Sequence, residues 1–246
     1  MIFDVLTLFP EIIENSCSFS ILKRAREQEI IKVNAINPRD YTKNKHKKVD
    51  DTPYGGGVGM VLAPQPIFDA YERIEKKSKY LPILLTPQGK QFDQNLAQKF
   101  SEYDQLILIC GHYEGFDERI RTGLDKDLFE LSIGDFVLTG GELAAMIVID
   151  SVSRLLSGTL GHDESSEGDT FSDGLLEYPQ YTKPRDYRGM KVPEILVNGN
   201  HEEINKWRRT QQFLRTKEKR PDLFTKFLEN DLSKTDKKLL NSIEKN

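Results

Sequence analysis

Short apolar runs alternate with amphipathic stretches through the first part of the chain. The apolar runs predict strands at residues 2–8, 31–36, 81–85 and 106–110, and helical spacing predicts helices at 19–28, 67–77 and 93–100. Asp93 is suited to cap the last of these helices, and Gly140-Gly141 opens a longer one that extends to about Leu156. The runs at 81–85 and 106–110 contain no alternating polar residues, which is typical of a parallel sheet covered on both faces. The pattern predicts an α/β fold with a mainly parallel sheet.

The pattern changes after Gly158. Residues 161–177 contain six acidic residues, no Lys or Arg, and several Ser and Gly residues, which is typical of a mobile linker. Helical periodicity then returns at 201–219, Pro221 restarts the chain, and Ser233 begins a last short helix. The sequence therefore predicts a domain over 1–160, a flexible linker over 161–176 and a small all-α domain over 177–246.

The charge is divided unevenly along the chain. The 246 residues include 35 Lys and Arg against 39 Asp and Glu, so the net charge of −4 excludes a uniformly basic coat for nucleic acid. Residues 201–246, however, carry 12 basic and 8 acidic side chains, whereas the first 200 residues carry a net charge of −8. A basic helical tail is therefore expected to follow an acidic α/β domain.

Several functional classes are disfavoured by what the sequence lacks. The two cysteines, Cys17 and Cys110, have no C-x-x-C spacing, which argues against a disulfide framework or a cysteine-rich zinc site. The four histidines have no metal-binding spacing, so no metal site is predicted. The start of the chain lacks a basic leader region, and the apolar runs are far shorter than the roughly 20 residues that a membrane span needs. We expect a soluble, cytoplasmic protein with no membrane partner.

Glycine-containing segments follow three predicted strands, at residues 85–89, 110–119 and 131–142. Ligands of open α/β sheets bind beyond the carboxyl ends of the strands, so these segments predict a pocket with backbone donors and acceptors. Such a lining suits adenine and a zwitterionic group. A fourth segment, 51–60, has four glycines in five residues but lacks the Gly-Lys-Ser/Thr of a Walker A loop. Any one segment is explained as well by a tight turn, whereas the three together favour a ligand site.

The charged candidates have simpler explanations when each is taken alone. Glu114 suits a surface turn, Arg154 suits an i,i+4 pair with Asp150, and Asp169 is one of six acids in the predicted linker. The basic stretches at 43–48 and 206–220 suit phosphate contacts or a solvated face, and the residues alone favour the solvated face.

Longer motifs carry a resemblance to a known family. The chain contains DVLTLFPE, DD-x-PYGGG-x-GM, LTPQGK, CGHYEGFDERI, SIGDFVLTGGE, FSDGLLEYPQYTKP and VPEILVNGNHEEI, the last followed by a Trp-Arg-Arg helix. In this order and spacing, up to about Pro221, the chain resembles the bacterial tRNA (guanine-N1)-methyltransferases of the TrmD family, in the SPOUT superfamily. Two positions depart from the pattern, because His112 and Thr52 each stand where the family usually has Arg.

The resemblance implies a fold, an assembly and an activity. The fold is a SPOUT-type sheet with a deep trefoil knot at its C-terminal end, followed by a helical tRNA-binding domain. The assembly is an antiparallel homodimer whose active sites lie between the subunits. The activity is methyl transfer from S-adenosylmethionine to N1 of guanosine 37 of tRNA, beside the anticodon and after a guanine, which supports reading-frame maintenance.

The resemblance also implies roles for individual residues. Asp169 is the general base and Arg154 stabilises charge on the guanine. The cofactor-binding set is Pro87, Gly89, Gly111, Tyr113, Ile133, Gly134, Asp135, Phe136, Val137, Leu138, Gly140 and Gly141. The tRNA-binding set is Glu114, Asp50, Ser165, Lys206, Arg208, Arg209 and Arg215. The resemblance is compatible with a Mg²⁺ ion among Glu114, Asp169 and phosphate, although no motif indicates one.

Two other functions are the alternatives. One is a SPOUT methyltransferase that acts on another RNA; the PYGGG loop and the FSDGLLEYP segment argue against it, because they belong to the narrower family. The other is a non-catalytic RNA-binding module, against which the presence of both Arg154 and Asp169 argues.

Overall fold

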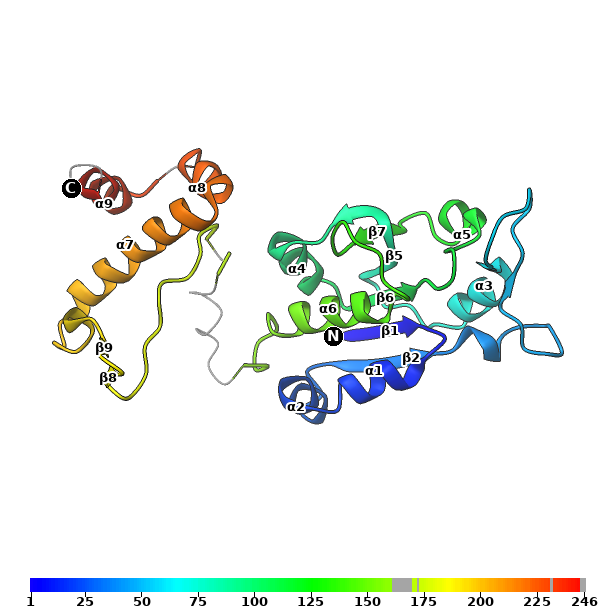
Figure 1. Ribbon diagram of the computed structural model, residues 1–246. Helices are drawn as coiled ribbons and strands as arrows, with labels where there is room; N and C mark the ends of the chain where they lie inside the picture. Colours follow the sequence, from blue (N-terminus) through cyan, green and yellow to red (C-terminus); the bar gives the residue numbers. More distant parts are fainter. Residues whose placement is uncertain (161–169, 172, 231, 244–246) are drawn as a thin grey trace. The chain divides into compact units, whose positions relative to one another are not determined.

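The chain divides into two compact units, Met1–Asp163 and Glu164–Asn246. The computed structural model describes residues 1–160, 170–171, 173–230 and 232–243 (Figure 1). Within these residues, no helix combines the length and the apolar character that crossing a membrane requires.

A five-stranded sheet forms the centre of the first unit. Its strands are β1 (Ile2–Leu6), β2 (Lys32–Ile36), β5 (Tyr80–Gln91), β6 (Gln105–Cys110) and β7 (Phe129–Ser132), in the spatial order β2-β1-β6-β5-β7. Every pairing between neighbours is parallel, so the predicted mainly parallel sheet is confirmed. All six residues of β6 are buried, which explains why this strand is a continuous apolar run.

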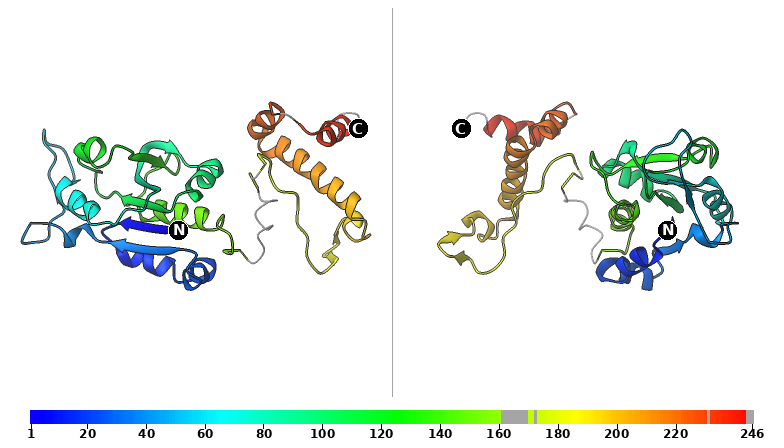
Figure 2. Two further views of the ribbon diagram at one scale, coloured as in Figure 1. Left: turned by 180° about the vertical axis from the view of Figure 1, so that it is seen from behind. Right: turned by 45° about the vertical axis from the view of Figure 1, so that its right-hand side comes forward.

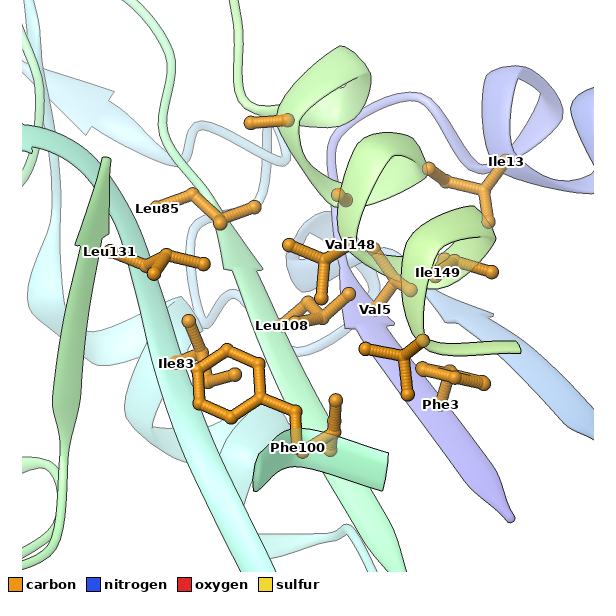
Figure 3. Close-up of a cluster of buried hydrophobic side chains, with 14 of the residues drawn as sticks. Phe3, Val5, Ile13, Ile83, Leu85, Phe100, Leu108, Leu131, Val148 and Ile149 are labelled. Carbon is orange, nitrogen blue, oxygen red and sulfur yellow. The ribbon is translucent and has the colours of Figure 1, made fainter. Parts of the chain in front are cut away.

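Helices cover both faces of this sheet. On one face lie α1 (Pro10–Ser16), α2 (Ser20–Glu27), α4 (Gln94–Ser101) and α6 (Glu142–Ser153), which pack on Phe3, Val5, Ile83 and Leu108 (Figure 3). On the other face α3 (Pro64–Glu72) and α5 (Glu118–Gly123) pack on Leu6, Leu84, Ile107 and Ile109. Successive residues of β6 thus point to opposite layers, as the period of a strand requires. Figure 2 gives two further views of these layers.

Several element boundaries differ from the predicted ones, since the first strand ends at Leu6, α3 at Glu72 and α6 at Ser153. Two further differences have local reasons. The helix expected at 67–77 begins earlier, at Pro64, because proline fits the first turn of a helix, where its missing N–H costs nothing. The strand expected at 81–85 continues to Gln91, with a bulge at which Leu85 and Lys90 both pair with Leu131. Asp93 caps α4 as predicted, since its carboxylate accepts the Leu96 N–H at 2.8 Å.

The second unit is mainly helical. It contains α7 (His201–Lys219), which has the bounds that its periodicity predicts, α8 (Pro221–Leu228) and α9 (Lys234–Ile243). It is not all-α as expected, because β8 (Asp186–Tyr187) and β9 (Met190–Lys191) form a short ribbon. The physical reason is the turn Arg188-Gly189, where both residues have positive φ and reverse the chain.

The core of this unit also includes part of the segment interpreted as linker. Leu175 is fully buried against Phe213 of α7, Phe227 of α8 and Leu239 of α9. The N–H of Leu176 donates to Oγ1 of the buried Thr216 at 2.9 Å. The described residues just before 177 therefore pack with the helices.

Arg209 ties the helices of this unit together. Its guanidinium donates to the carboxylates of Asp236, with Nε at 2.9 Å, and of Asp173. The same group lies over the rings of Phe213 and Phe227, at 5.0 and 5.4 Å from their centroids. The bond from Arg209 lowers the pKa of Asp236. Arg209 thus acts as a structural cation that joins α7 to α9.

The lowered pKa of Asp236 predicts how Asp236→Asn changes stability. A depressed folded-state pKa contributes stability above the unfolded pKa of about 3.9, and this is lost as pH falls through the folded pKa. At pH 7 we expect the variant unit to be less stable by about 1.5–3 kcal/mol, the usual contribution of a charged hydrogen bond. The difference should disappear at a pH below the folded-state pKa of Asp236, because the wild-type carboxyl is then neutral, as the amide of the variant is. Denaturant unfolding followed through Trp207, the only tryptophan and a residue of α7, measures it. A difference that does not shrink as the pH is lowered from 7 into acid would contradict this account.

Candidate active site

The three segments that follow β5, β6 and β7 meet around one pocket. Because these strands are parallel neighbours, their carboxyl ends lie at the same edge of the sheet. The pocket has a volume of about 340 Å³, within the roughly 300–1,000 Å³ that is usual for small-molecule sites. It is lined by residues 85–88, 111–116, 118, 121, 131–134, 136–141 and 144.

Most of the residues predicted to bind a cofactor line this pocket. Pro87 belongs to the first segment, Gly111 and Tyr113 to the second, and the third contributes Ile133, Gly134, Phe136, Val137, Leu138, Gly140 and Gly141. Three apolar side chains of this third segment, Phe136, Val137 and Leu138, remain exposed, so they offer an apolar surface to a ligand. Gly89 and Asp135 are not among the lining residues.

Two of the predicted glycines are needed by the packing of the protein itself. A Cβ on Gly89 would lie 2.3 Å from the Leu131 backbone nitrogen, which places Gly89 at the contact between β5 and β7. A Cβ on Gly141 would lie 2.7 Å from Cα of Cys110. The Gly141 N–H donates to the Gly111 carbonyl at 2.9 Å, so the start of α6 lies directly on the end of β6.

A buried polar cluster supports the base of this pocket. His112 places Nε2 2.8 Å from both carboxylate oxygens of Glu142, the first residue of α6. The Thr7 hydroxyl, which follows β1, donates to the same carboxylate at 2.5 Å. The ring of Phe9 packs on His112 at 5.0 Å between centroids. His112 therefore connects the segment after β6 to both α6 and the end of β1.

Cys110 lies beside this cluster but is not a nucleophile. Burial, and then the charge of Glu142, raise the pKa of its thiol well above the usual value. The thiol therefore stays protonated at neutral pH, and thiolate chemistry at this position is disfavoured.

The glycine-rich segment at 51–60 borders the pocket through Glu114. The Glu114 N–H donates to the Met60 carbonyl at 3.0 Å, and the Glu114 side chain lies against Gly59. Asp50 begins β3 (Asp50–Asp51), which pairs with β4 (Val61–Leu62). Glu114 lines the pocket, whereas Asp50 and the segment 51–60 are not among its lining residues.

The structure does not bring Arg154 to the pocket of its own chain. Gly141 precedes α6 at the pocket, whereas Arg154 follows the helix at its other end. The 12 residues of α6 separate the two ends by roughly 18 Å at 1.5 Å per residue. The other predicted catalytic residue, Asp169, and the predicted substrate contact Ser165 lie outside the described residues.

Comparison with known proteins identifies the family. The profile of the tRNA (guanine-1)-methyltransferase TrmD family matches residues 1–226. The chain belongs to this family. A tRNA (guanine-N(1)-)-methyltransferase of Caldicellulosiruptor saccharolyticus is 56% identical over 91% of this chain and 90% of its own length. Proteins of the same name from Halalkalibacterium halodurans and Caldanaerobacter subterraneus are 54% and 55% identical, each over 98% of this chain and 97% of their own length.

The remaining residues predicted from the family resemblance lie on α7. Arg209 is engaged by Asp173 and Asp236, and Nη1 of Arg215 donates to the Glu177 carbonyl at 3.3 Å. Arg208 lies over the ring of Tyr178, and Lys206 is exposed. Among the residues that the structure describes, no group of three or more His, Cys, Asp or Glu side chains is placed to hold a metal ion.

The pocket also contains residues that sequence reasoning missed. Gln88 and Arg121 line it, and Arg121 bonds both Glu130, at 2.5 Å, and the hydroxyl of Thr86, at 3.3 Å. Arg121 follows the CGHYEGFDERI motif by one residue and carries no signal of its own. Only the packing of α5 near β5 and β7 makes it part of the site.

The contact at Gly141 predicts a strong effect of a single methyl group. Gly141→Ala places Cβ against the backbone of Cys110 and Gly111, which cannot yield without separating α6 from β6. We expect the free energy of unfolding of the first unit to fall by about 1–3 kcal/mol or more, the usual cost of overpacking. Gly123→Ala is the matched control, because its Cβ would meet only Phe68 at an ordinary 3.6 Å. Equal stability of the two variants in denaturant titrations would refute this role.

Proposed function

We propose that the protein transfers a methyl group from S-adenosylmethionine to N1 of guanosine 37 in tRNA, and so supports maintenance of the reading frame. The family membership over residues 1–226 carries this proposal. The relatives named above are called tRNA (guanine-N(1)-)-methyltransferases, and the similarity covers nearly their whole length. The pocket agrees with it, because the segments that line the pocket are those on which the sequence resemblance rests.

The lining of the pocket fits S-adenosylmethionine. Phe136, Leu138 and Ile133 offer apolar surface to a neutral base, and the glycine-containing segments offer backbone N–H and C=O groups. Glu114 places a carboxylate at the pocket, which is favourable for a cationic ligand, while the other acidic lining residue, Glu118, is paired with Arg121 at 3.2 Å. When bound, this cofactor supplies an electrophilic methyl group. The Mg²⁺ ion that the resemblance allows would be held in part by Asp169, which lies outside the described residues.

Two residues carry the chemistry at the guanine. N1 of guanine holds a proton and is a poor nucleophile until that proton leaves. The carboxylate of Asp169 accepts the N1 proton as the new N–C bond forms. The guanidinium of Arg154 donates to O6, where negative charge develops as the proton departs.

The position of Arg154 supports a homodimer whose active site combines two chains. A helix length separates Arg154 from the pocket of its own subunit, so Arg154 serves the pocket of the other subunit. α6 also exposes Leu143 and Ile147, which are one turn apart on one face of the helix, with exposed fractions of 58% and 43%. Ile12 on the adjoining α1 is exposed as well. An apolar surface of this kind favours burial against a second copy.

The proposal includes the trefoil knot in the first unit and the binding of tRNA by the second unit. The order of the strands supports the knot. In the sheet β7 pairs with β5 and not with β6, although β6 lies between β5 and β7 in the sequence. The basic residues of α7 and the net positive charge of residues 201–246 support binding of tRNA by the second unit.

Methyl transfer to defined transcripts tests the proposed function. Purified protein with labelled S-adenosylmethionine should methylate a tRNA transcript with guanines at 36 and 37, and the product should be 1-methylguanosine at 37. A transcript with adenine at 37 should accept no label, because it lacks the acceptor. Methylation of the adenine-37 transcript at another position, or of ribosomal RNA alone, would replace this function with activity on another RNA.

The same assay, run as single turnovers, tests the proposed base. Asp169→Asn keeps the shape of the side chain but removes the proton acceptor, so the rate should fall by about 10²- to 10⁴-fold. Asp163→Asn is the matched control, because it removes an equal charge from the same segment. Equal losses in the two variants would assign the effect to charge and withdraw the base role of Asp169.

Mixing two inactive chains tests the shared active site. Arg154→Ala removes the donor, and Leu138→Arg blocks the pocket with a long charged side chain. In a mixed dimer, one site has an intact pocket from the first chain and an intact Arg154 from the second. Unfolding and refolding the two chains together in equal amounts should restore up to about a quarter of the wild-type activity, since about half of the dimers are then mixed and each has one good site. No recovery, with mixed dimers demonstrated by differential tags, would place Arg154 in the pocket of its own chain.

A further inference from the structure

The second unit contains a pocket that is lined only by residues of this unit. It has a volume of about 530 Å³ and lies between the stretch 178–185, the region after β9 and the first half of α7. Its apolar floor includes Leu196 and Ile204. Two tyrosines of the EYPQYTKP stretch, Tyr178 and Tyr181, line it as well. The proposed function makes no use of this pocket.

Arg208 is the most informative residue of this pocket. Its guanidinium lies over the ring of Tyr178, with 4.9 Å between the guanidinium carbon and the ring centroid. Its Nε is buried, and no described residue accepts a hydrogen bond from it. A buried cationic donor without an acceptor is costly. Arg208 also lines the pocket, so its guanidinium is a cation that a ligand in the pocket meets.

The charges at this pocket favour an anion. Of the described residues that line it, none is acidic, while Lys183, Arg185 and Arg208 are basic. Arg185 is engaged by Glu194 at 2.6 Å, which leaves Lys183 and Arg208 to meet an incoming anion. Arg209, the next residue along α7, is held by Asp173 and Asp236 and so belongs to the fold of the unit.

We infer that this pocket receives one unstacked nucleotide from a single-stranded part of the bound RNA. The base stacks on Tyr181 and beside Tyr178, and its phosphate accepts hydrogen bonds from Arg208 and Lys183. Aromatic faces with neighbouring cations are the usual elements of single-strand recognition. A paired helix is disfavoured, because its bases are held in the stack and cannot enter a pocket. This inference rests on the proposed function for the identity of the RNA as tRNA.

Binding of a tRNA transcript to the full chain, measured over a series of salt concentrations, tests the inference. Tyr181→Ala removes a half-exposed ring and should weaken binding by about 5- to 150-fold, the usual effect of losing one stacked base. The salt slope should stay unchanged in this variant, because no charge is lost. Arg208→Gln and Lys183→Gln should each reduce the slope by about one, as expected for lost phosphate contacts. Tyr181→Phe keeps the ring and should restore the affinity.

A matched aromatic and cationic pair in the same unit provides the control. Arg188 lies over Tyr187 at 5.2 Å, and neither residue lines the pocket. Tyr187→Ala and Arg188→Gln should leave the affinity unchanged, and thermal unfolding monitored through Trp207 checks that every variant is folded. Equal losses from the two pairs, or no loss in the folded pocket variants, would overturn the inference. A wild-type chain that binds the transcript without methylating it would end the proposed function and leave this test valid.

Discussion

The contact between the start of α6 and the end of β6 determines much of the first unit. Gly141 lies on the backbone of Cys110, and its N–H bonds the Gly111 carbonyl at 2.9 Å. This contact sets where α6 begins, and therefore where the third pocket segment ends. Because a helix is rigid, it also sets where α6 delivers Arg154, at the opposite end from the pocket. A single close approach of two backbones thus positions both the pocket and the residue that is proposed to serve a second subunit.

The pocket itself depends on the parallel direction of β5, β6 and β7. Parallel strands end at one edge, so three segments that are distant in sequence contribute to one lining. The buried bonds of His112 and Thr7 with Glu142 hold the segment after β6 against α6. His112 makes this connection through one ring nitrogen, which lies 2.8 Å from both oxygens of the Glu142 carboxylate.

The second unit uses two consecutive arginines in different ways. Successive residues of a helix point about 100° apart, so Arg208 and Arg209 face different surroundings. Arg209 is held by two carboxylates and lies over two core phenylalanines, and it stabilises the packing of the helices. Arg208 lies over Tyr178 at a pocket whose described lining residues include no acidic side chain. The net charge of a basic segment therefore does not equal the charge that it offers to a ligand.

The sequence by itself determined the α/β class, the parallel direction of the sheet and the bounds of α7, because apolar periodicity reports directly which faces are buried. It also placed most of the pocket residues together, since glycine-containing segments after parallel strands must share an edge. The tertiary structure alone decided that Gly89 and Gly141 serve internal packing, that Arg121 joins the pocket, and that Arg209 is structural. Each of these depends on which backbone or charge lies opposite in space, and neither composition nor spacing carries that information. The short ribbon of β8 and β9 was also decided by the tertiary structure, because a two-residue pairing is too short to produce a periodic signal in the sequence.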